Sequence, residues 1–438
     1  MLLFQKLLFP RFGRLLSPRI GAIFSAERKQ RHLRKTSRED IVDGEWEPPF
    51  CAAIDLGATS GRVILGNRSG AMREIHRFPT PMKRTEEGIF WDFAGLSAGV
   101  LAGLAKLDAE RDGVAVISCD SWAQDFGLLN ARGELIHDPF SYRDEHSAIH
   151  TRDRLEYIRR RFPEIFAPAV RLLHIADLIH YRLCGAMRSN YTLTAISKLP
   201  PDFELFAPGA DGEVIGRVNH PALPALAGVP VVSGAGHDTA AAFVGGDVRP
   251  GELLISLGTW FMAAELWDAD RPIPAGFGPL PLPGKRLART VGGMGMWPFQ
   301  QCVKQWKARG EFPGYPALDA AAAASAVPGE IDPDDPTLFS PENMEEAVFR
   351  LAGRRLPPGD VTALLLRGVA AKLGRRAAEF GREFSRVVLV GGAGGSPLVR
   401  ELLAARLPAP LACRGTEAAA RGNILTALRA CAPEPGRR

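Results

Sequence analysis

The chain has 438 residues, of which 46% are hydrophobic and 24% are charged, as is typical of a globular protein with full-sized cores. At about 100–200 residues per domain, this length predicts two domains. The formal net charge is +5, and much of the basic excess lies in residues 1–40. The net charge therefore does not argue for a basic binding face on the folded body, and we expect no nucleic-acid partner.

Residues 1–49 mix Leu and Phe with many Arg and Lys residues. This segment lacks the compact apolar core of a secretory signal. An amphipathic targeting segment is one interpretation. A disordered extension, or a start codon assigned too early, is the interpretation we favour, so the folded domains are expected to begin near Phe50.

From Phe50 to residue 247 the pattern alternates strands and helices, which predicts a mixed α/β domain. An apolar run into Gly57 predicts a strand, a tight turn and a return strand over 51–66. Further strands are expected at 73–78, 113–120, 126–130 and 229–233, and helices at 91–107, 154–161 and 172–183. Small residues at 234–242 predict a turn followed by a closely packed helix.

A second domain is expected to start at 248, after a Gly- and Pro-containing crossover. It opens with a hairpin from Leu253. The elements expected after it are a loop at 333–341, a helix at 361–380, a strand running into a glycine-rich turn over 387–396, and a helix from Pro397. The predicted organisation is therefore 50–247, 248–430 and a tail at 431–438.

Two segments, 51–62 and 253–260, share one pattern: an apolar strand, a polar residue, a Gly and a hydroxyl. Glycine in such a turn lets the backbone approach a ligand, and amides with hydroxyls can hold an oxyanion. Two such hairpins indicate two similar domains that face one phosphate group. This layout resembles the superfamily of sugar kinases, actin and chaperone ATPases, and two ordinary hairpins are the alternative.

Two acids at strand ends are candidates for phosphoryl-transfer chemistry. Asp55 stands beside the first turn, where an acid can hold Mg²⁺ through water because Mg²⁺ needs few protein carboxylates, and a turn cap is the alternative. Asp238 follows His237 at the end of a strand. Phosphoryl transfer to a hydroxyl needs a carboxylate near the attacking oxygen, although Asp238 can equally cap the following helix. His237 can bind a sugar hydroxyl or simply pack.

Residues 120–125 place two carboxylates and an indole between two expected strands. Carboxylates accept hydrogen bonds from sugar hydroxyls and an indole covers an apolar sugar face, so this run suits a carbohydrate pocket. Trp122 as a plain core residue is the alternative. The glycine-rich run at 391–395 is not followed by Lys-Ser or Lys-Thr, so it is no Walker loop, and it lacks the spacing of a dinucleotide fingerprint.

The six cysteines form no CxxC pair and have no His at metal-ligand spacing. This pattern predicts reduced, buried thiols in a cytoplasmic protein and argues against a thiolate metal site. No stretch reaches about 18 uninterrupted apolar residues, so we expect no transmembrane helix and no membrane partner. The sequence leaves a monomer and a homodimer both open.

Taken together and in order, these segments resemble the FGGY carbohydrate kinases, and within that family the rhamnulokinases. The resemblance covers most of the chain from Phe50 to Leu428. The matching segments are 53–62, 73–78, 120–126, 141–144, 181–185, 237–240, 257–260, 294–297 with Gln300, 390–392, and Glu417-Ala418 with Gly422-Asn423.

The resemblance implies a two-domain, actin-like (ribonuclease H-like) ATPase fold of α/β class with an interdomain cleft. It implies that Asp238 is the proton acceptor and that Asp55 serves a Mg²⁺ ion. The expected sugar-binding residues are Asp120, Trp122, Ala123, His237, Asp238, Thr239 and Gly292. The expected ATP-binding residues are Ala58, Thr59, Ser60, Gly61, Arg62, Thr259, Gln300 and Gly392.

The implied reaction is transfer of the ATP γ-phosphoryl group to the primary hydroxyl of a ketose, with L-rhamnulose as the leading substrate. The chain departs from the rhamnulokinase pattern in two places that bear on the sugar. Gly292 or Gly293 stands where those proteins carry an Asn, and the stretch from Asp144 to Leu173 is shorter. L-fuculose, another deoxyketose or a polyol therefore remain alternatives, as does a non-catalytic protein that binds ATP or sugar.

Overall fold

The computed structural model describes residues 40–42, 44–144, 150–339 and 341–431. The chain separates into two units, residues 1–41 and residues 42–438, and the fold below is that of the second unit. Strand β1 (Asp40–Val42) is the first described element, and residues 44–49 form no helix or strand. The expected extension and tail lie largely outside the described residues.

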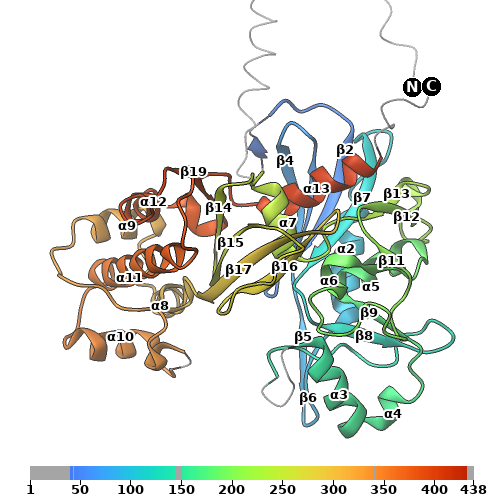
Figure 1. The fold of residues 1–438 in the computed structure, drawn as a ribbon, viewed down its shortest axis with the longest axis horizontal. Coiled ribbons are helices and arrows are strands. Elements are labelled where there is room, and N and C mark those ends of the chain that lie inside the picture. The colour runs from blue at the N-terminus through green and yellow to red at the C-terminus, as the bar shows by residue number, and fades with distance from the viewer. Residues whose placement is uncertain (1–39, 43, 145–149, 340, 432–438) are drawn as a thin grey trace, which may run out of the picture. The chain divides into compact units, whose positions relative to one another are not determined.

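A mixed sheet forms the core of the first half of the chain (Figure 1). Six of its strands are, in spatial order, β4 (Ala71–Pro79), β3 (Ser60–Gly66), β2 (Phe50–Leu56), β7 (Val114–Ser121), β13 (Pro230–Ser233) and β12 (Glu213–Arg217). Strands β2 and β3 form the predicted antiparallel hairpin. Strand β7 runs parallel to both β2 and β13, so these three strands end at the same edge of the sheet.

Smaller ladders and helices complete this half. The ladders are β5 (Met82–Thr85) with β6 (Gly88–Trp91), β8 (Phe126–Leu129) with β9 (Arg171–His174), and β10 (Ser189–Asn190) with β11 (Gly209–Ala210). The helices are α2 (Phe93–Leu104), α3 (Thr151–Arg161), α4 (Pro163–Phe166), α5 (Ile175–Cys184), α6 (Tyr191–Thr194), the 3₁₀ turn η1 (Pro224–Leu226) and α7 (Asp238–Gly245).

The second half of the chain builds another mixed sheet. Its strands are, in spatial order, β16 (Gly278–Leu282), β17 (Arg286–Met294), β15 (Trp260–Trp267), β14 (Glu252–Leu257), β18 (Arg386–Val390) and β19 (Leu411–Cys413). The hairpin β14–β15 is antiparallel, and β14 runs parallel to β18. Each sheet thus contains a hairpin whose first strand pairs in parallel with a later strand, as expected for a duplicated domain.

The second half of the chain also forms helices. They are α8 (Trp297–Ala308), α9 (Tyr315–Ala323), η2 (Pro336–Leu338), α10 (Met344–Ala352), α11 (Pro358–Ala378), η3 (Gly392–Gly395), α12 (Pro397–Ala404) and α13 (Ala418–Ala430). Among the described residues, no helix is long and apolar enough to cross a membrane.

The two faces of β2 pack against different partners. Phe50, Ala52, Ile54 and Leu56 join the apolar core that includes α2 and α5. Because successive side chains of a strand point to opposite faces, Asp55 faces the other side of the sheet. Helix α13 packs there against β2 and β7, so the acid lies under the last helix of the chain.

Two helices are exchanged between the halves of the chain (Figure 1). Helix α7, which follows the first sheet in sequence, packs on the second sheet, where Phe243 joins a cluster with Leu254 and Leu282. Helix α13, which follows the second sheet, packs on the first. The two helices also pack against each other. Each sheet is thus covered in part by a helix from the other half of the chain.

The contact between α7 and α13 depends on glycine. A Cβ atom at Gly422 would overlap the carbonyl oxygen of Ala241, and a Cβ atom at Gly245 would overlap that of Ala418. Both overlaps are with backbone, which cannot rotate away as a long side chain can. Hydrogen atoms at these two positions therefore permit the close crossing.

Two sequence predictions need correction at their edges. The helix expected from residue 91 starts at Phe93, because Trp91 ends β6 and the Asp92 side chain caps α2 by accepting from the Gly95 amide. The helix expected at 172–183 is wrong for its first residues. Residues 171–174 form β9, which pairs with β8. Their apolar side chains continue the helical spacing of the residues that follow, so the pattern alone did not separate the strand from the helix.

The cysteine prediction is correct for four residues and wrong for one. Cys51, Cys119, Cys184 and Cys302 are buried free thiols, whereas Cys413 at the end of β19 is exposed. The remaining one, Cys431, is half-buried. Cys413 lies on a strand at the edge of its sheet, where burial is incomplete.

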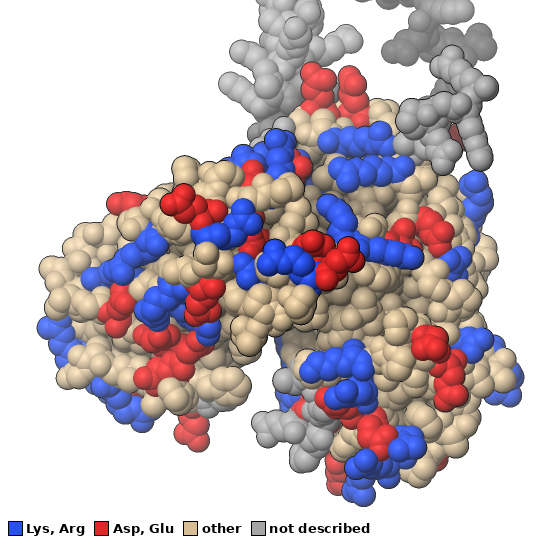
Figure 2. All heavy atoms as spheres, in the orientation of Figure 1, with Lys and Arg blue, Asp and Glu red and all other residues tan. Residues whose placement is uncertain are grey.

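Charged residues of both signs are mixed over the face that Figure 2 shows. Several form exposed ion pairs along helices, such as Arg159 with Glu156 and Arg376 with Glu379. Such pairs contribute little to stability individually because solvent screens them. On this face they leave no extended region of one sign.

We expect Gly422→Ala to lower the free energy of unfolding by about 1–3 kcal/mol, since overpacking forces backbone apart at the α7–α13 crossing. Chemical denaturation followed by circular dichroism measures the change. Gly209→Ala is the matched control, because a Cβ atom at Gly209 meets nothing within 4 Å. If the two variants were equally stable, the claim that the α7–α13 crossing is a tight backbone contact would be contradicted.

Candidate active site

Acidic residues gather where β2, β7 and β13 end. Asp55 and Asp120 are register partners on the neighbouring parallel strands β2 and β7. Both are buried, Asp55 at 3% exposure and Asp120 at 0%. Asp238 follows β13 as the first residue of α7. The carboxyl ends of parallel strands commonly carry binding sites, and here each of three neighbouring strands leads to an acid.

Arg62 pairs with two of the acids near this edge. Its guanidinium donates from Nη2 to Asp55 Oδ2 at 2.7 Å and from Nη1 to Glu417 Oε2 at 2.5 Å. Glu417 is the residue immediately before α13. Arg62 therefore joins the first hairpin to the end of the chain, and its charge offsets part of the buried negative charge.

Asn423, on α13, donates a hydrogen bond to Asp120. Its Nδ2 donates to Asp120 Oδ2 at 3.0 Å, while Asp120 Oδ1 has no hydrogen-bond partner in the described structure. A buried carboxylate oxygen without a donor is costly, and a proton or a nearby cation would relieve that cost.

The surroundings shift the pKa values of both buried acids upward. Burial raises the pKa of Asp55 to about 6, the charge of Arg62 opposes this, and the charges of Glu417 and Asp238 add to it. Burial raises the pKa of Asp120 well above its ordinary value, and the charges of Asp55 and Asp238 add to that shift. The acids are thus close enough to repel one another, and the cluster carries more negative than positive charge.

Asp238 is the most accessible acid of the cluster. Its side chain is 36% exposed, against 4% for Asp55 and 9% for Glu417. Asp238 Oδ1 accepts from Thr239 Oγ1 at 3.1 Å and lies 3.3 Å from His237 Nε2. Residue His237, not Asp238, occupies the N-cap position of α7, so the alternative of Asp238 as helix cap is not what the structure shows.

His237 is buried beside this acid. Burial lowers the pKa of His237, and the charge of Asp238 opposes the shift. His237 also forms an isolated parallel bridge with Ser121, the last residue of β7. The bridge fixes the approach of the loop before α7 to the end of β7.

The run at 120–125 turns largely inward. Trp122 is 5% exposed and joins the core, and its Nε1 donates to Asp125 Oδ2 at 2.9 Å. Asp125 also accepts from Trp91 Nε1 and pairs with the buried Arg154. Its carboxylate is therefore engaged by protein donors. Trp122 therefore packs as a core residue, which was the alternative to a sugar-facing indole. Ala123 is half-buried at the edge of this group.

The first hairpin turn holds the other residues expected near a phosphate. Gly57 N donates to Ser60 O at 3.2 Å, which closes the turn. Thr80 braces it, with its Oγ1 donating to Gly57 O at 2.7 Å. Ala58 and Ser60 are half-buried, Thr59 is exposed and Gly61 is buried. The tip of the turn is therefore open while its base is fixed.

A second group of expected residues meets at the end of the second sheet. Thr259, in the β14–β15 turn, donates from Oγ1 to Gln300 Oε1 on α8 at 2.8 Å. Strands β14 and β18 are parallel, so the glycine-rich turn after β18 ends at the same edge. Gly391 there has φ +96°, which favours glycine, and Gly392 is exposed with no atom within 4 Å of an added Cβ.

Gly292 lies on β17 of the same sheet, opposite Met262 on β15. Its position is exposed. The structure thus brings Asp55, Arg62, Asp120 and Asp238 together at one sheet, and Thr259, Gln300 and Gly392 together at the other. Gly292 belongs to the second sheet and not to the group around Asp238.

Sequence reasoning assigned no role to Glu417 or Asn423, although both stand in a segment that matched the family. The signal available was weak, because Glu417 only precedes the helix and Asn423 is one of four polar residues on an Ala-rich segment. Their contacts join positions far apart in sequence, Glu417 to Arg62 and Asn423 to Asp120. Neither contact could be predicted without knowing where α13 packs.

Within the described ranges, no group of three or more His, Cys, Asp or Glu side chains is arranged to hold a metal ion by itself. Mg²⁺ usually keeps several waters and takes one or two carboxylates together with substrate phosphates. A single acid such as Asp55, in a cluster with excess negative charge, fits that mode of binding. It would not fit a metal held only by protein ligands.

A cavity of about 970 Å³ lies elsewhere in the first half of the chain. It is lined mainly by α2, α5 and the turn after β8, and residues such as Phe93, Leu135 and Tyr181 border it. None of the residues expected at the site lines it. The chemistry of the acid cluster is therefore independent of this cavity.

Comparisons with known proteins agree with the fold. Residues 253–431 match the C-terminal domain of the FGGY family of carbohydrate kinases. A rhamnulokinase from Bacteroides thetaiotaomicron is 26% identical over 85% of this chain and 89% of its own length.

Solved structures with the same fold include two xylulose kinases. The ligand-bound enzyme from Lactobacillus acidophilus has a TM-score of 0.68 at 15% identity and covers 87% of this chain and 89% of its own. That from Rhodospirillum rubrum has a TM-score of 0.67 at 18% identity and covers 87% and 90%. The predicted actin-like, α/β fold of sugar kinases is confirmed.

The raised pKa of Asp55 predicts a pH-dependent stability. The native state holds a proton on Asp55 between its ordinary pKa of 3.8 and about 6, where the unfolded chain has lost it. The stabilisation from this bound proton is therefore fully present below pH 3.8 and is lost as the pH rises through about 6. Relative to Asp55→Asn, the wild-type melting temperature should fall across this window in Mg²⁺-free buffer.

Asp112→Asn is the control for this measurement. The hydrogen bond from Arg111 is the largest cause that lowers the pKa of Asp112, so the contribution of Asp112 is fully present above pH 3.8 and is lost only below it. The difference in melting temperature between wild type and Asp112→Asn should therefore stay constant across the Asp55 window. The Asp55 prediction would be contradicted if wild type and Asp55→Asn showed parallel melting curves across the window.

Proposed function

We propose that this chain, a carbohydrate kinase of the FGGY family, transfers the γ-phosphoryl group of ATP to the primary hydroxyl of a ketose. L-rhamnulose is the leading substrate and L-rhamnulose 1-phosphate the product. The similarity to a rhamnulokinase over most of both chains supports this choice of sugar. L-fuculose or another deoxyketose is the alternative.

The accessibility of Asp238 carries the proposal. Among the acids at the edge of the first sheet, it alone presents a substantially exposed carboxylate, and it stands at the start of a helix behind a fixed loop. A proton acceptor must reach the hydroxyl that attacks phosphorus, whereas buried acids can act only on their neighbours. Asp238 therefore takes the proton of the sugar hydroxyl as the new bond to phosphorus forms.

The sugar is held beside Asp238 in this proposal. His237 and Thr239 flank the acid, and Ala123 offers its backbone at the end of the run after β7. Asp120 is a fully buried member of the acid cluster and would support the sugar site from beneath. Trp122 supports the sugar site from within the core, and Gly292 would reach the sugar from the second sheet.

The nucleotide is held by the two turns. The tip formed by Ala58, Thr59 and Ser60, with Gly61 at its base, offers amides and hydroxyls to phosphate oxygens. Thr259 and Gln300 do so from the second sheet, and the open space beside Gly392 leaves room for adenosine against the backbone. Arg62 would contribute its positive charge near the phosphates.

Mg²⁺ neutralises phosphate charge during such transfers when it is bound. Asp55 would hold it through water, in keeping with the single-carboxylate mode described above. The negative charges around Asp55 favour a cation there, and Arg62 keeps the carboxylate oriented through the hydrogen bond to Oδ2.

We expect Asp238→Asn to lower sugar-dependent ADP release about 100- to 10,000-fold, because an amide cannot accept the proton. A coupled assay over a panel of ketoses, polyols and gluconate, with ATP and Mg²⁺, measures the rate and identifies the sugar. Isothermal titration should show that ATP affinity is largely kept.

Asp360→Asn is the matched control, since Asp360 also lies in the first turn of a helix but on α11. It should turn over like wild type. Wild-type turnover by Asp238→Asn would remove Asp238 from its role, and ATP binding without turnover on any sugar would favour a non-catalytic protein.

A further inference from the structure

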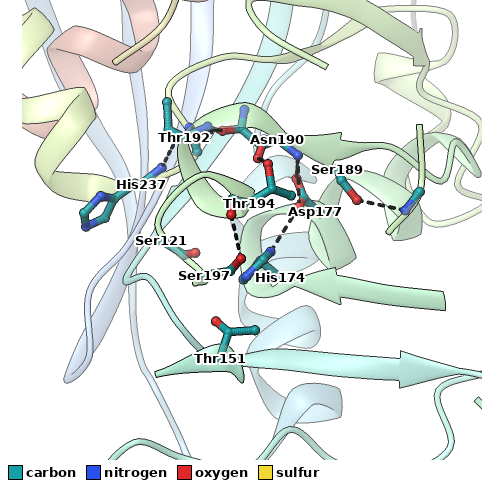
Figure 3. A network of polar contacts seen from close by, with 12 residues as sticks. Ser121, Thr151, His174, Asp177, Ser189, Asn190, Thr192, Thr194, Ser197 and His237 are labelled. Atoms are coloured by element: carbon teal, nitrogen blue, oxygen red, sulfur yellow. Dashed lines mark hydrogen bonds and ion pairs between the residues drawn. The ribbon is translucent and has the colours of Figure 1, made fainter. Parts of the chain in front are cut away.

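The loop that delivers Asp238 to the site is held by hydrogen bonds from two sides. Residues 234–237 connect the end of β13 to α7. From one side, Ser121 N donates to Gly236 O at 2.9 Å. From the other side, Asn190 and Thr192 bind the same loop (Figure 3). Neither Asn190 nor Thr192 belongs to the residues assigned to sugar, nucleotide or metal.

Asn190 binds the start and the middle of the loop. Its Nδ2 donates to Gly234 O at 2.6 Å and to Ser233 Oγ at 2.9 Å, and its Oδ1 accepts from Gly236 N at 3.3 Å. The side chain is fully buried. A Cβ atom at Gly236 would lie 2.7 Å from Asn190 Cγ, so the loop approaches this amide as closely as glycine allows.

Thr192 binds the end of the loop. Its Oγ1 accepts from His237 N at 3.0 Å and donates to Asn190 Oδ1 at 2.6 Å. His237 is the N-cap residue of α7, and its own side chain makes no capping hydrogen bond. The hydroxyl of Thr192 therefore fixes the backbone amide of the residue immediately before Asp238.

The network is anchored away from the site. Asn190 N lies 3.2 Å from each carboxylate oxygen of Asp177, a buried residue of α5. Figure 3 shows Asp177, Asn190, Thr192 and His237 following one another from the anchor to the loop. The side-chain polar atoms of Asn190 and Thr192 all have partners, and satisfied buried groups of this kind are held in one arrangement.

We propose that Asn190 and Thr192 are positioning residues that fix the 234–237 loop and thereby aim the Asp238 carboxylate at the sugar hydroxyl. The inference rests on the proposed role of Asp238 as proton acceptor. Proton transfer requires the acceptor within hydrogen-bond reach of the reacting hydroxyl, and small displacements of a catalytic group cost rate steeply. None of the residues assigned to ATP lies in this loop.

The test uses a matched set of substitutions on α6. Thr192→Val keeps the shape of the side chain but removes the hydroxyl, and Thr192→Ser keeps the hydroxyl. Thr194→Val removes a hydroxyl from the same helix that donates only to Asn190 O and Tyr191 O. We expect Thr192→Val to lower kcat roughly 10- to 100-fold with little change in the KM for ATP. Thr192→Ser and Thr194→Val should stay near wild type.

The same substitutions in the Asp238→Asn background identify the route of the effect. If Thr192 acts through Asp238, Thr192→Val should cause no further loss of the residual rate there. Melting temperature and ATP affinity, measured for every variant, report whether the protein is folded. A Thr192→Val protein that binds ATP like wild type and yet has lost kcat supports the inference.

Three results would overturn it: wild-type kcat in Thr192→Val, equal losses from Thr192→Val in both backgrounds, or equal damage in Thr192→Ser and Thr192→Val. Failure of the proposed function gives a different result. If Asp238→Asn turns over like wild type, the role of Asp238 is lost and this inference with it. If Asp238→Asn is impaired and Thr192→Val is not, only this inference fails.

Discussion

Three parallel strands that end at one edge set the chemistry of this protein, because each leads to an acid. Pairing of β2 with β7 brings Asp55 opposite Asp120, and pairing of β7 with β13 brings the start of α7, with Asp238, to the same edge. Carboxylates placed so close repel one another, and burial adds to the cost. The remaining structure around this edge has to make that accumulation of charge tolerable while leaving one carboxylate accessible.

Helix α13 meets much of that requirement from the opposite end of the chain. It places Asn423 on Asp120 and, through Glu417, helps orient Arg62 against Asp55. The helix can lie this close because Gly422 and Gly245 remove side chains from its crossing with α7. Since α7 begins with Asp238, the two exchanged helices couple the buried acids, the accessible acid and the second sheet in one packed unit.

The exposed acid is supported differently from the buried ones. Asp55 and Asp120 are held by side chains that contact them directly, whereas Asp238 is aimed by the backbone that precedes it. Asn190 and Thr192 satisfy the polar groups of that backbone. Such an arrangement leaves the carboxylate of Asp238 accessible to a substrate, because the backbone is fixed one residue earlier and the described side-chain hydrogen bond to the carboxylate comes only from the neighbouring Thr239.

The sequence by itself determined the fold class, both hairpins and the strands that lead to the three acids, since apolar runs that end in Gly and a hydroxyl are local patterns. It also singled out Asp55, Asp120 and Asp238, because acids at strand ends can be read along the chain. Only the tertiary structure decided that Trp122 and Asp125 face inward, that β9 is a strand, that Glu417 and Asn423 contact the acid cluster, and that Asn190 and Thr192 bind the loop before Asp238. These depend on contacts between residues far apart in sequence, and no local periodicity records which helix will cross which sheet.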